Sequence, residues 1–205
     1  MPKITKEHVD ARRRQVMTAA HHCFARHGFH ETTMQEIADE AGLSAGALYQ
    51  YFESKDALIE ALADRGREIR REALGGLQRG GGAQALAQVV GGLLRPLADA
   101  TPETEAALRL DIRLWGEALD QPGIRQLFLD QSATLKRPIA DFLRAERKAG
   151  RIRRDVDPEG VADAVFALLV GLELQTALDS RFDVNRYTKT LNMLLGLMAT
   201  PDRGP

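Results

Sequence analysis

The sequence predicts an all-α protein of about nine helices, and three observations lead to that fold class. Apolar residues recur at intervals of three and four rather than two. Aromatic residues, which favour strands, make up only 5% of the 205 residues. Most apolar segments begin at a helix-capping residue or end at glycine or proline. No segment alternates convincingly, and no repeat of about 20–50 residues is present.

Four helices are expected in the first seventy or so residues. The first carries one apolar face and ends at Gly28, a typical C′ residue. The second begins with a capping box at Thr33 and ends at Gly42. Ser44 caps the third, expected over residues 45–51, and Ser54 caps the fourth.

The rest of the chain continues the helical pattern. Two glycine groups, 75–76 and 80–82, predict a flexible link between helices. Two later helices open with proline, Pro102 and Pro158, at a position where the missing N–H has no helical partner in any case. The expected helices cover residues 83–98, 101–120, 124–149, 157–178 and 186–198.

Composition excludes several classes of protein. The apolar content of 44% excludes disorder throughout, and the single cysteine, Cys23, excludes a disulfide scaffold. The longest apolar run, residues 164–172, is too short to span a bilayer, and the charged N-terminus does not resemble a secretory signal. We therefore expect a cytoplasmic protein without a membrane segment. Phosphate loops, nucleotide fingerprints and nucleophile–base motifs are absent, so we expect no enzyme activity, no cofactor and no metal.

The second and third helices form a helix-turn-helix pattern through Gly42-Leu43-Ser44. The second helix of such a pair can enter the major groove of DNA with its N-terminal residues at the base edges. Here that end carries Ala45, Gly46 and Ala47, whose small size lets the backbone approach the bases. Gln50 follows and can form a paired hydrogen bond with adenine.

The segment Thr32 to Leu58 resembles the N-terminal DNA-binding domain of the TetR family of transcriptional regulators. The resemblance extends back through Phe24–Phe29 and covers about 50 residues without a gap. The remainder is similar in size and helix count to the effector-binding and dimerisation domain of that family. Its part from Trp115 to Leu178 resembles the AcrR-like and BetI-like branches.

The resemblance implies roles for individual residues. Thr33 and Lys55 would contact phosphates, and Tyr49 and Tyr51 would place hydroxyl groups on the DNA backbone. Many members have histidine at the position of Tyr51 and a polar residue near the position of Ala47. Because this chain has few polar side chains there, sequence specificity would come from Gln50 together with the shape of the DNA. The expected DNA-contacting residues are Thr33, Ser44, Ala45, Gly46, Ala47, Tyr49, Gln50, Tyr51 and Lys55.

The charge of this region is unusual for a DNA-binding domain. Residues 1–60 contain seven Lys or Arg and nine Asp or Glu. Non-specific binding is therefore expected to be weak. Arg12-Arg13-Arg14 in the first helix has two interpretations that the sequence leaves open, namely a phosphate contact and a solvated helix start.

The C-terminal half predicts a homodimer and an effector pocket. Residues 161–178 form a helix that is apolar nearly all round, and the last helix is also rich in leucine, so both need a partner surface. Glu173 and Gln175 are polar residues within the first of these helices and would contact either a cationic or amphipathic ligand or the interface. An effector pocket is expected to be lined by Leu108, Asp111, Ile112, Trp115, Phe142 and Phe166, although each of these residues also suits an ordinary core.

Together these observations predict two domains. Residues 1–60 would bind double-stranded DNA at an inverted-repeat operator. Residues 61–205 would bind an unknown small-molecule effector and dimerise through the last two helices. The expected function is a repressor that its effector releases from DNA. The alternative is a helix-turn-helix protein with a vestigial pocket, regulated by protein contacts or by abundance.

Overall fold

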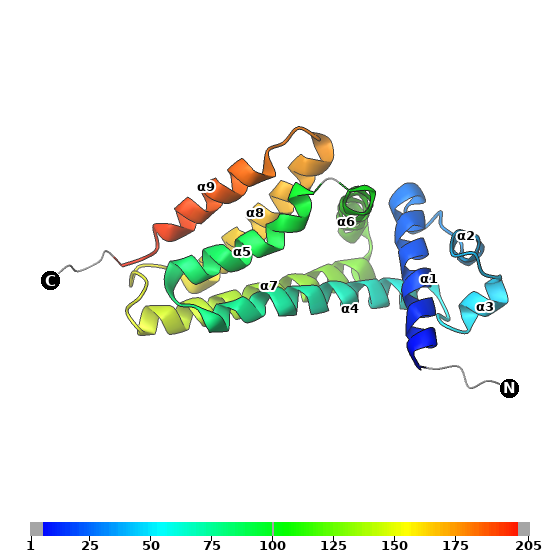
Figure 1. The fold of residues 1–205 in the computed structure, drawn as a ribbon, viewed down its shortest axis with the longest axis horizontal. Coiled ribbons are helices and arrows are strands. Elements are labelled where there is room, and N and C mark those ends of the chain that lie inside the picture. The colour runs from blue at the N-terminus through cyan, green and yellow to red at the C-terminus, as the bar shows by residue number, and fades with distance from the viewer. Residues whose placement is uncertain (1–5, 100, 201–205) are drawn as a thin grey trace. The chain divides into compact units, whose positions relative to one another are not determined.

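The structure is a computed structural model that describes residues 6–99 and 101–200 (Figure 1). Across this part of the chain it contains nine α-helices, one 3₁₀ helix (η1) and a single isolated β-bridge. The predicted all-α fold class is confirmed. The elements are α1 (Lys6–His27), α2 (Met34–Glu40), α3 (Ala45–Tyr49), α4 (Lys55–Leu74), η1 (Gly75–Arg79), α5 (Gly82–Ala98), α6 (Pro102–Asp120), α7 (Pro122–Lys148), α8 (Pro158–Leu178) and α9 (Val184–Gly196).

Several sequence expectations differ from the structure. The helix expected over residues 124–149 begins at Pro122, and the last helix, expected over residues 186–198, covers Val184–Gly196. The glycine-rich segment predicted as a flexible link contains the 3₁₀ helix η1. Leu77 within it is only 4% exposed, because it packs into an apolar core that also holds Leu74. The third helix ends at Tyr49 rather than at residue 51.

The helices divide into two compact units. The first consists of the chain up to Gly66 together with Glu105–Arg125, and the second consists of Arg67–Thr104 and the chain from Gln126 onward. The first unit thus includes most of α6, which is distant from α1–α3 in sequence. The predicted functional division after residue 60 stays a prediction.

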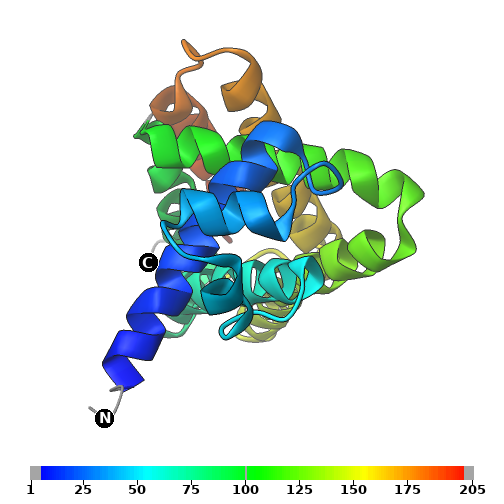
Figure 2. The same ribbon diagram turned by 90° about the vertical axis from the view of Figure 1, so that its right-hand side faces the viewer.

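The first unit is built on the apolar face of α1. Val16, Ala20 and Phe24 of α1 are fully buried, as are Ile37 of α2 and Leu48 of α3. Figure 1 shows α2 and α3 on one side of α1, and Figure 2, which views the molecule from that side, shows them in front of it. Burial of these side chains supplies the main stabilisation of the small unit.

The second unit has a separate core. Helix α5 packs against α8 and α9 (Figure 1). Its side chains Leu86, Val90 and Leu94 share one apolar cluster with residues of α7, α8 and α9. An isolated bridge between Ile152 and Ala199 joins the segment that follows α9 to the connection between α7 and α8.

Helix α8 carries more apolar side chains than its contacts within this chain bury. The helix is 21 residues long and extends beyond Glu173, where the apolar run of residues 164–172 stops. By length and composition alone the whole helix could cross a membrane, whereas that run is too short. Only 22% of its most apolar stretch is buried within the chain. One face, with Val165 and Leu172, packs into the core, while Leu178 is 78% exposed. The described residues leave much of the apolar surface of α8 uncovered.

A buried carboxylate secures the start of α5. Glu146 of α7 is 5% exposed in its side chain and accepts two hydrogen bonds of 2.6 Å from the Arg151 guanidinium. It also accepts the backbone N–H of Gly82, where α5 has no side-chain cap of its own. These hydrogen bonds, those from Arg151 first, hold the pKa of Glu146 below its ordinary value of 4.5.

Replacing Glu146 with glutamine tests this anchor. Because the folded-state pKa is lowered, the contribution of the carboxylate to stability is complete above pH 4.5 and disappears as the pH falls through the folded-state value. We expect Glu146→Gln to lower the free energy of unfolding by about 2 kcal/mol at neutral pH, and by less in acid. Urea unfolding at several pH values measures the difference. Asp163→Asn, at a carboxylate that is 67% exposed, is the control and should change stability little. An equal effect of Glu146→Gln at all pH values would contradict the assignment.

Candidate nucleic-acid interface

A tight turn joins α2 to α3. Gly42 adopts φ +64°, a left-handed conformation in which other residues are strained. Its N–H donates to the carbonyl of Asp39 at 3.0 Å, and the N–H of Leu43 donates to that of Ala38 at 2.9 Å. This glycine-terminated end of α2 reverses the chain within a few residues and sets the direction in which α3 begins.

The N-terminus of α2 contains the predicted capping box. The N–H of Glu36 donates to the Thr33 hydroxyl oxygen at 3.2 Å, and the N–H of Thr33 donates to the Glu36 carboxylate at 2.7 Å. The Thr33 hydroxyl also donates to that carboxylate, at 3.0 Å. The backbone hydrogen bond from Thr33, followed by that from its hydroxyl, lowers the pKa of Glu36. The family resemblance predicts that Thr33 contacts a phosphate. In the structure Thr33 is exposed, and its hydrogen bonds with Glu36 stabilise the start of α2.

Helix α3 presents a mixture of small and polar residues to its surroundings. Ser44 caps it by accepting the N–H of Ala47 at 3.2 Å. Within the helix, Leu48 is buried on the inner face, whereas Tyr49 is 52% exposed. A Cβ atom added to Gly46 would meet no heavy atom within 4 Å, so the fold does not require glycine there. Of the other predicted contact residues, Ser44 and Gln50 are exposed, and Ala45, Ala47 and Tyr51 are half-buried.

Lys55 has partners that the sequence could not indicate. Its ammonium group donates to the carbonyl oxygen of Phe29 at 2.8 Å and to that of His30 at 3.1 Å. It also lies 4.7 Å from the centroid of the Phe29 ring. The start of α4 thereby fixes the loop that leads into α2. An ammonium group has three N–H donors, so one remains for a phosphate.

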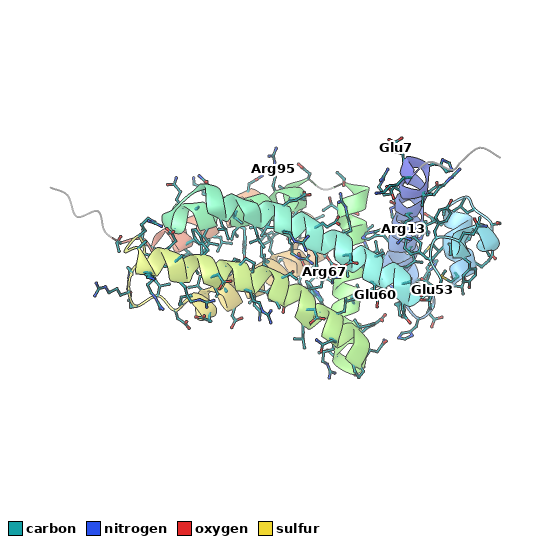
Figure 3. All side chains as sticks on the ribbon, turned by 90° about the horizontal axis from the view of Figure 1, so that it is seen from below. Glu7, Arg13, Glu53, Glu60, Arg67 and Arg95 are labelled. Atoms are coloured by element: carbon teal, nitrogen blue, oxygen red, sulfur yellow. The ribbon has the colours of Figure 1, made fainter. Side chains whose placement is uncertain are left out.

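Side chains of α1 contact the ends of α2 and α3. Arg13, labelled in Figure 3, donates to the carbonyl oxygen of Tyr51 at 2.7 Å, and its guanidinium lies 4.2 Å from the centroid of the Phe52 ring. Gln15 donates to the carbonyl oxygen of Ala41 at 2.6 Å. Sequence reasoning missed these positioning contacts, because each partner lies more than twenty residues away in the chain and both hydrogen bonds go to backbone oxygens, which any residue type supplies.

The C-terminal end of α2 is also held by an ion pair. Glu40 accepts from Arg26 at 2.5 Å and lies 3.4 Å from His22. The hydrogen bond from Arg26 lowers the pKa of Glu40. The nearby Cys23 is buried, and burial raises the pKa of its thiol, which suits a packing role.

Helix α6 joins the first unit at the loop between α1 and α2. His30 hydrogen-bonds to Gln121 and lies 3.8 Å from the carboxylate of Glu117, which accepts from Gln121 at 3.2 Å. A hollow of about 340 Å³ lies beside this junction, lined by two histidines, two glutamates, two glycines and Arg113. No predicted effector residue lines it. Among the described residues, no group of three or more His, Cys, Asp or Glu side chains is arranged to hold a metal ion.

The predicted effector residues lie on three helices. On α6, in the first unit, Leu108 is buried, Ile112 and Trp115 are half-buried, and Asp111 is exposed. The other two, Phe142 of α7 and Phe166 of α8, are half-buried in the second unit; the Phe166 ring packs 5.7 Å from that of Phe128, centroid to centroid. That these residues line one pocket stays a prediction.

A capped α2, a glycine turn and a short α3 with exposed polar residues define a helix-turn-helix DNA-binding protein. Comparison with known proteins agrees. Residues 16–62 match the N-terminal domain of bacterial regulatory proteins of the tetR family. Residues 84–198, more than half of the chain, match the C-terminal domain of BetI-type transcriptional repressors.

Individual relatives align over nearly the whole chain. The HTH-type transcriptional repressor Rv1474c of Mycobacterium tuberculosis is 30% identical over 195 residues, which cover 95% of this chain and 96% of the relative. The HTH-type transcriptional regulator BetI of Escherichia coli is 28% identical over 188 residues, covering 88% and 89%. A solved regulator from Saccharomonospora viridis, in complex with choline, is 26% identical, with a TM-score of 0.70 and coverage of 91% and 96%. The chain belongs to the TetR family, with a BetI-type C-terminal domain, and is a DNA-binding transcriptional regulator rather than an enzyme.

The two roles of Lys55 can be measured separately. In Lys55→Met, loss of the bonds to Phe29 and His30 should lower the free energy of unfolding by about 1–2 kcal/mol in the absence of DNA. If the remaining N–H contacts a phosphate, the slope of log affinity against log salt concentration should also fall by about one. Urea unfolding and salt-dependent DNA binding give the two readouts. Lys148→Met, at an exposed lysine of α7, is the matched control. Unchanged stability would show that the carbonyl contacts carry no weight.

Proposed function

We propose that this regulator is a repressor that binds an inverted-repeat operator as a homodimer and leaves it when a small-molecule effector binds the C-terminal domain. The apolar faces that α8 and α9 leave uncovered, in a chain whose α3 is free to enter a groove, carry this proposal. A DNA-binding regulator acts where the DNA lies, so we place it in the cytoplasm.

The dimer explains the apolar surface of the second unit. Large apolar side chains are exposed on both last helices, including Leu178 of α8 at 78% and Met193 of α9 at 61%, and Leu197 directly after α9 is 65% exposed. A two-fold axis would bring the same helices of two protomers together and bury these side chains. The α3 helices of the two protomers, which are the recognition helices, would then face successive major grooves. An inverted repeat presents the same base sequence to each of them.

For the effector, the choline complex of the Saccharomonospora viridis regulator supports a quaternary ammonium compound as the first class to test. Aromatic faces attract such cations, and the chain offers Trp115, Phe142 and Phe166 among the expected pocket residues. The alternative is a vestigial pocket, with regulation by protein contacts or abundance. Thermal unfolding with choline and a panel of uncharged compounds separates the two, because a ligand that binds only the folded state raises the midpoint.

The main experiment selects genomic DNA fragments with the purified protein at a stated salt concentration and sequences the bound DNA. Recovery of an inverted repeat supports the operator and gives its half-site spacing. Loss of binding when an effector is added supports release. Failure to enrich any sequence by folded, dimeric protein would overturn the proposed operator.

Gly46 separates DNA approach from folding. A methyl group at this position meets nothing in the protein, and alanine favours a helix by up to about 1 kcal/mol over glycine. Gly46→Ala should therefore keep or raise the thermal midpoint while it weakens operator binding at least about tenfold, since the methyl group would collide with DNA. Gly116→Ala, also at an open glycine within a helix, is the control. Full operator binding by Gly46→Ala would contradict close approach at α3.

A charge on the uncovered face of α9 tests the dimer. Because a two-fold interface repeats each substitution, Met193→Glu should weaken dimerisation at least about 100-fold and shift the protein to monomers in sedimentation equilibrium. Leu119→Glu provides the comparison, since Leu119 is 75% exposed but lies on α6 in the first unit. A stable dimer of the Met193 variant would place the interface elsewhere.

A further inference from the structure

The three consecutive arginines of α1 have three different environments. Arg12 donates to the side-chain oxygen of Gln15 at 2.8 Å, and Arg13 donates to the carbonyl oxygen of Tyr51. Arg14 is exposed, and its side chain makes no hydrogen bond or ion pair with any of the described residues. The sequence alone does not tell the three apart, but of the three only Arg14 has a guanidinium with no hydrogen bond to the described residues.

The recognition helix depends on contacts from outside. With five residues, α3 is too short to be stable alone. Leu48 and Phe52 anchor its underside by burial. The direction of its C-terminal end depends on the chain at Tyr51 and Phe52, where the Arg13 guanidinium both donates to a carbonyl oxygen and covers a ring. The planar guanidinium can do both at once.

A second contact of the same kind reaches the other end of the turn. Gln15, whose amide is oriented by Arg12, donates to the carbonyl oxygen of Ala41, the C-cap residue of α2. Helix α1 thus holds the chain at two points through backbone carbonyl oxygens. One, at Ala41, lies before the turn, and the other, at Tyr51, lies after α3. A cation near the last carbonyl groups of a helix is also electrostatically favourable.

We propose that Arg13 is a positioning residue for operator recognition and not a phosphate contact. It fixes the C-terminal end of α3, and thereby the place of Gln50 relative to the bases. The inference rests on the proposed operator recognition through α3. It assigns the arginine triplet one residue that positions α3, one that orients Gln15, and one, Arg14, that remains available to DNA.

Arg13→Met tests the assignment, because methionine keeps an apolar stem but removes the donor and the charge. The probes are a duplex carrying the inverted repeat recovered by genomic selection and an unrelated duplex of equal length. We expect the preference for the first duplex to fall at least about tenfold, with the slope of log affinity against log salt unchanged. Combined with Gln50→Ala, the losses should be less than additive, because both act through the same base contacts.

Arg14→Met is the matched control and should leave the preference unchanged, whatever its effect on the salt slope. If Arg13→Met instead lowers the slope by about one and keeps the preference, Arg13 contacts a phosphate and the proposal is wrong. Should that variant fail to fold, Arg13→Lys retains the charge without the planar group. A positioning role predicts a reduced preference at an unchanged slope, and a phosphate role predicts wild-type behaviour. A wild-type protein that shows no preference would overturn the proposed operator recognition itself.

Discussion

The first unit depends on one constraint, that a helix of five residues must be held by its neighbours. Burial of Leu48 fixes which face of α3 points inward, and the Ser44 cap fixes where the helix begins. The left-handed Gly42 fixes its direction relative to α2. Because each support lies on the inner side or at an end, the outer face of α3 can carry small residues and exposed polar groups.

Local features of this fold could be predicted from sequence, and long-range ones could not. The capping box of Thr33 and Glu36 and the Ser44 cap of α3 each depend on residues within three positions of each other. The helix-turn-helix was predictable for the same reason. Lys55 instead donates to backbone carbonyl oxygens 25 and 26 residues away, which any residue types could supply. The contacts of α6 and of Gln121 directly after it with the loop between α1 and α2 involve His30, Glu117 and Gln121, whose pattern in sequence carries no signal.

The two units are stabilised differently, and the difference follows their roles. The second unit combines a large apolar cluster with the Glu146–Arg151 anchor, and its last two helices still leave leucines in solvent. The first unit is smaller; in addition to the apolar core on α1, single hydrogen bonds from side chains to backbone carbonyl oxygens, such as those of Arg13 and Gln15, hold its turn. A DNA-reading unit of this kind keeps its geometry without a broad apolar surface.

The internal use of cations in the first unit has a consequence for how many molecules a cell needs. Lys55 and Arg13 donate hydrogen bonds to backbone carbonyl oxygens, and Arg26 forms an ion pair with Glu40. In addition, acidic residues outnumber basic ones in residues 1–60. We therefore expect attraction to arbitrary DNA to be weak, so that few copies would be bound along the rest of the chromosome. Most would then remain free to find the proposed operator, and a small number of molecules would be enough to keep one site occupied.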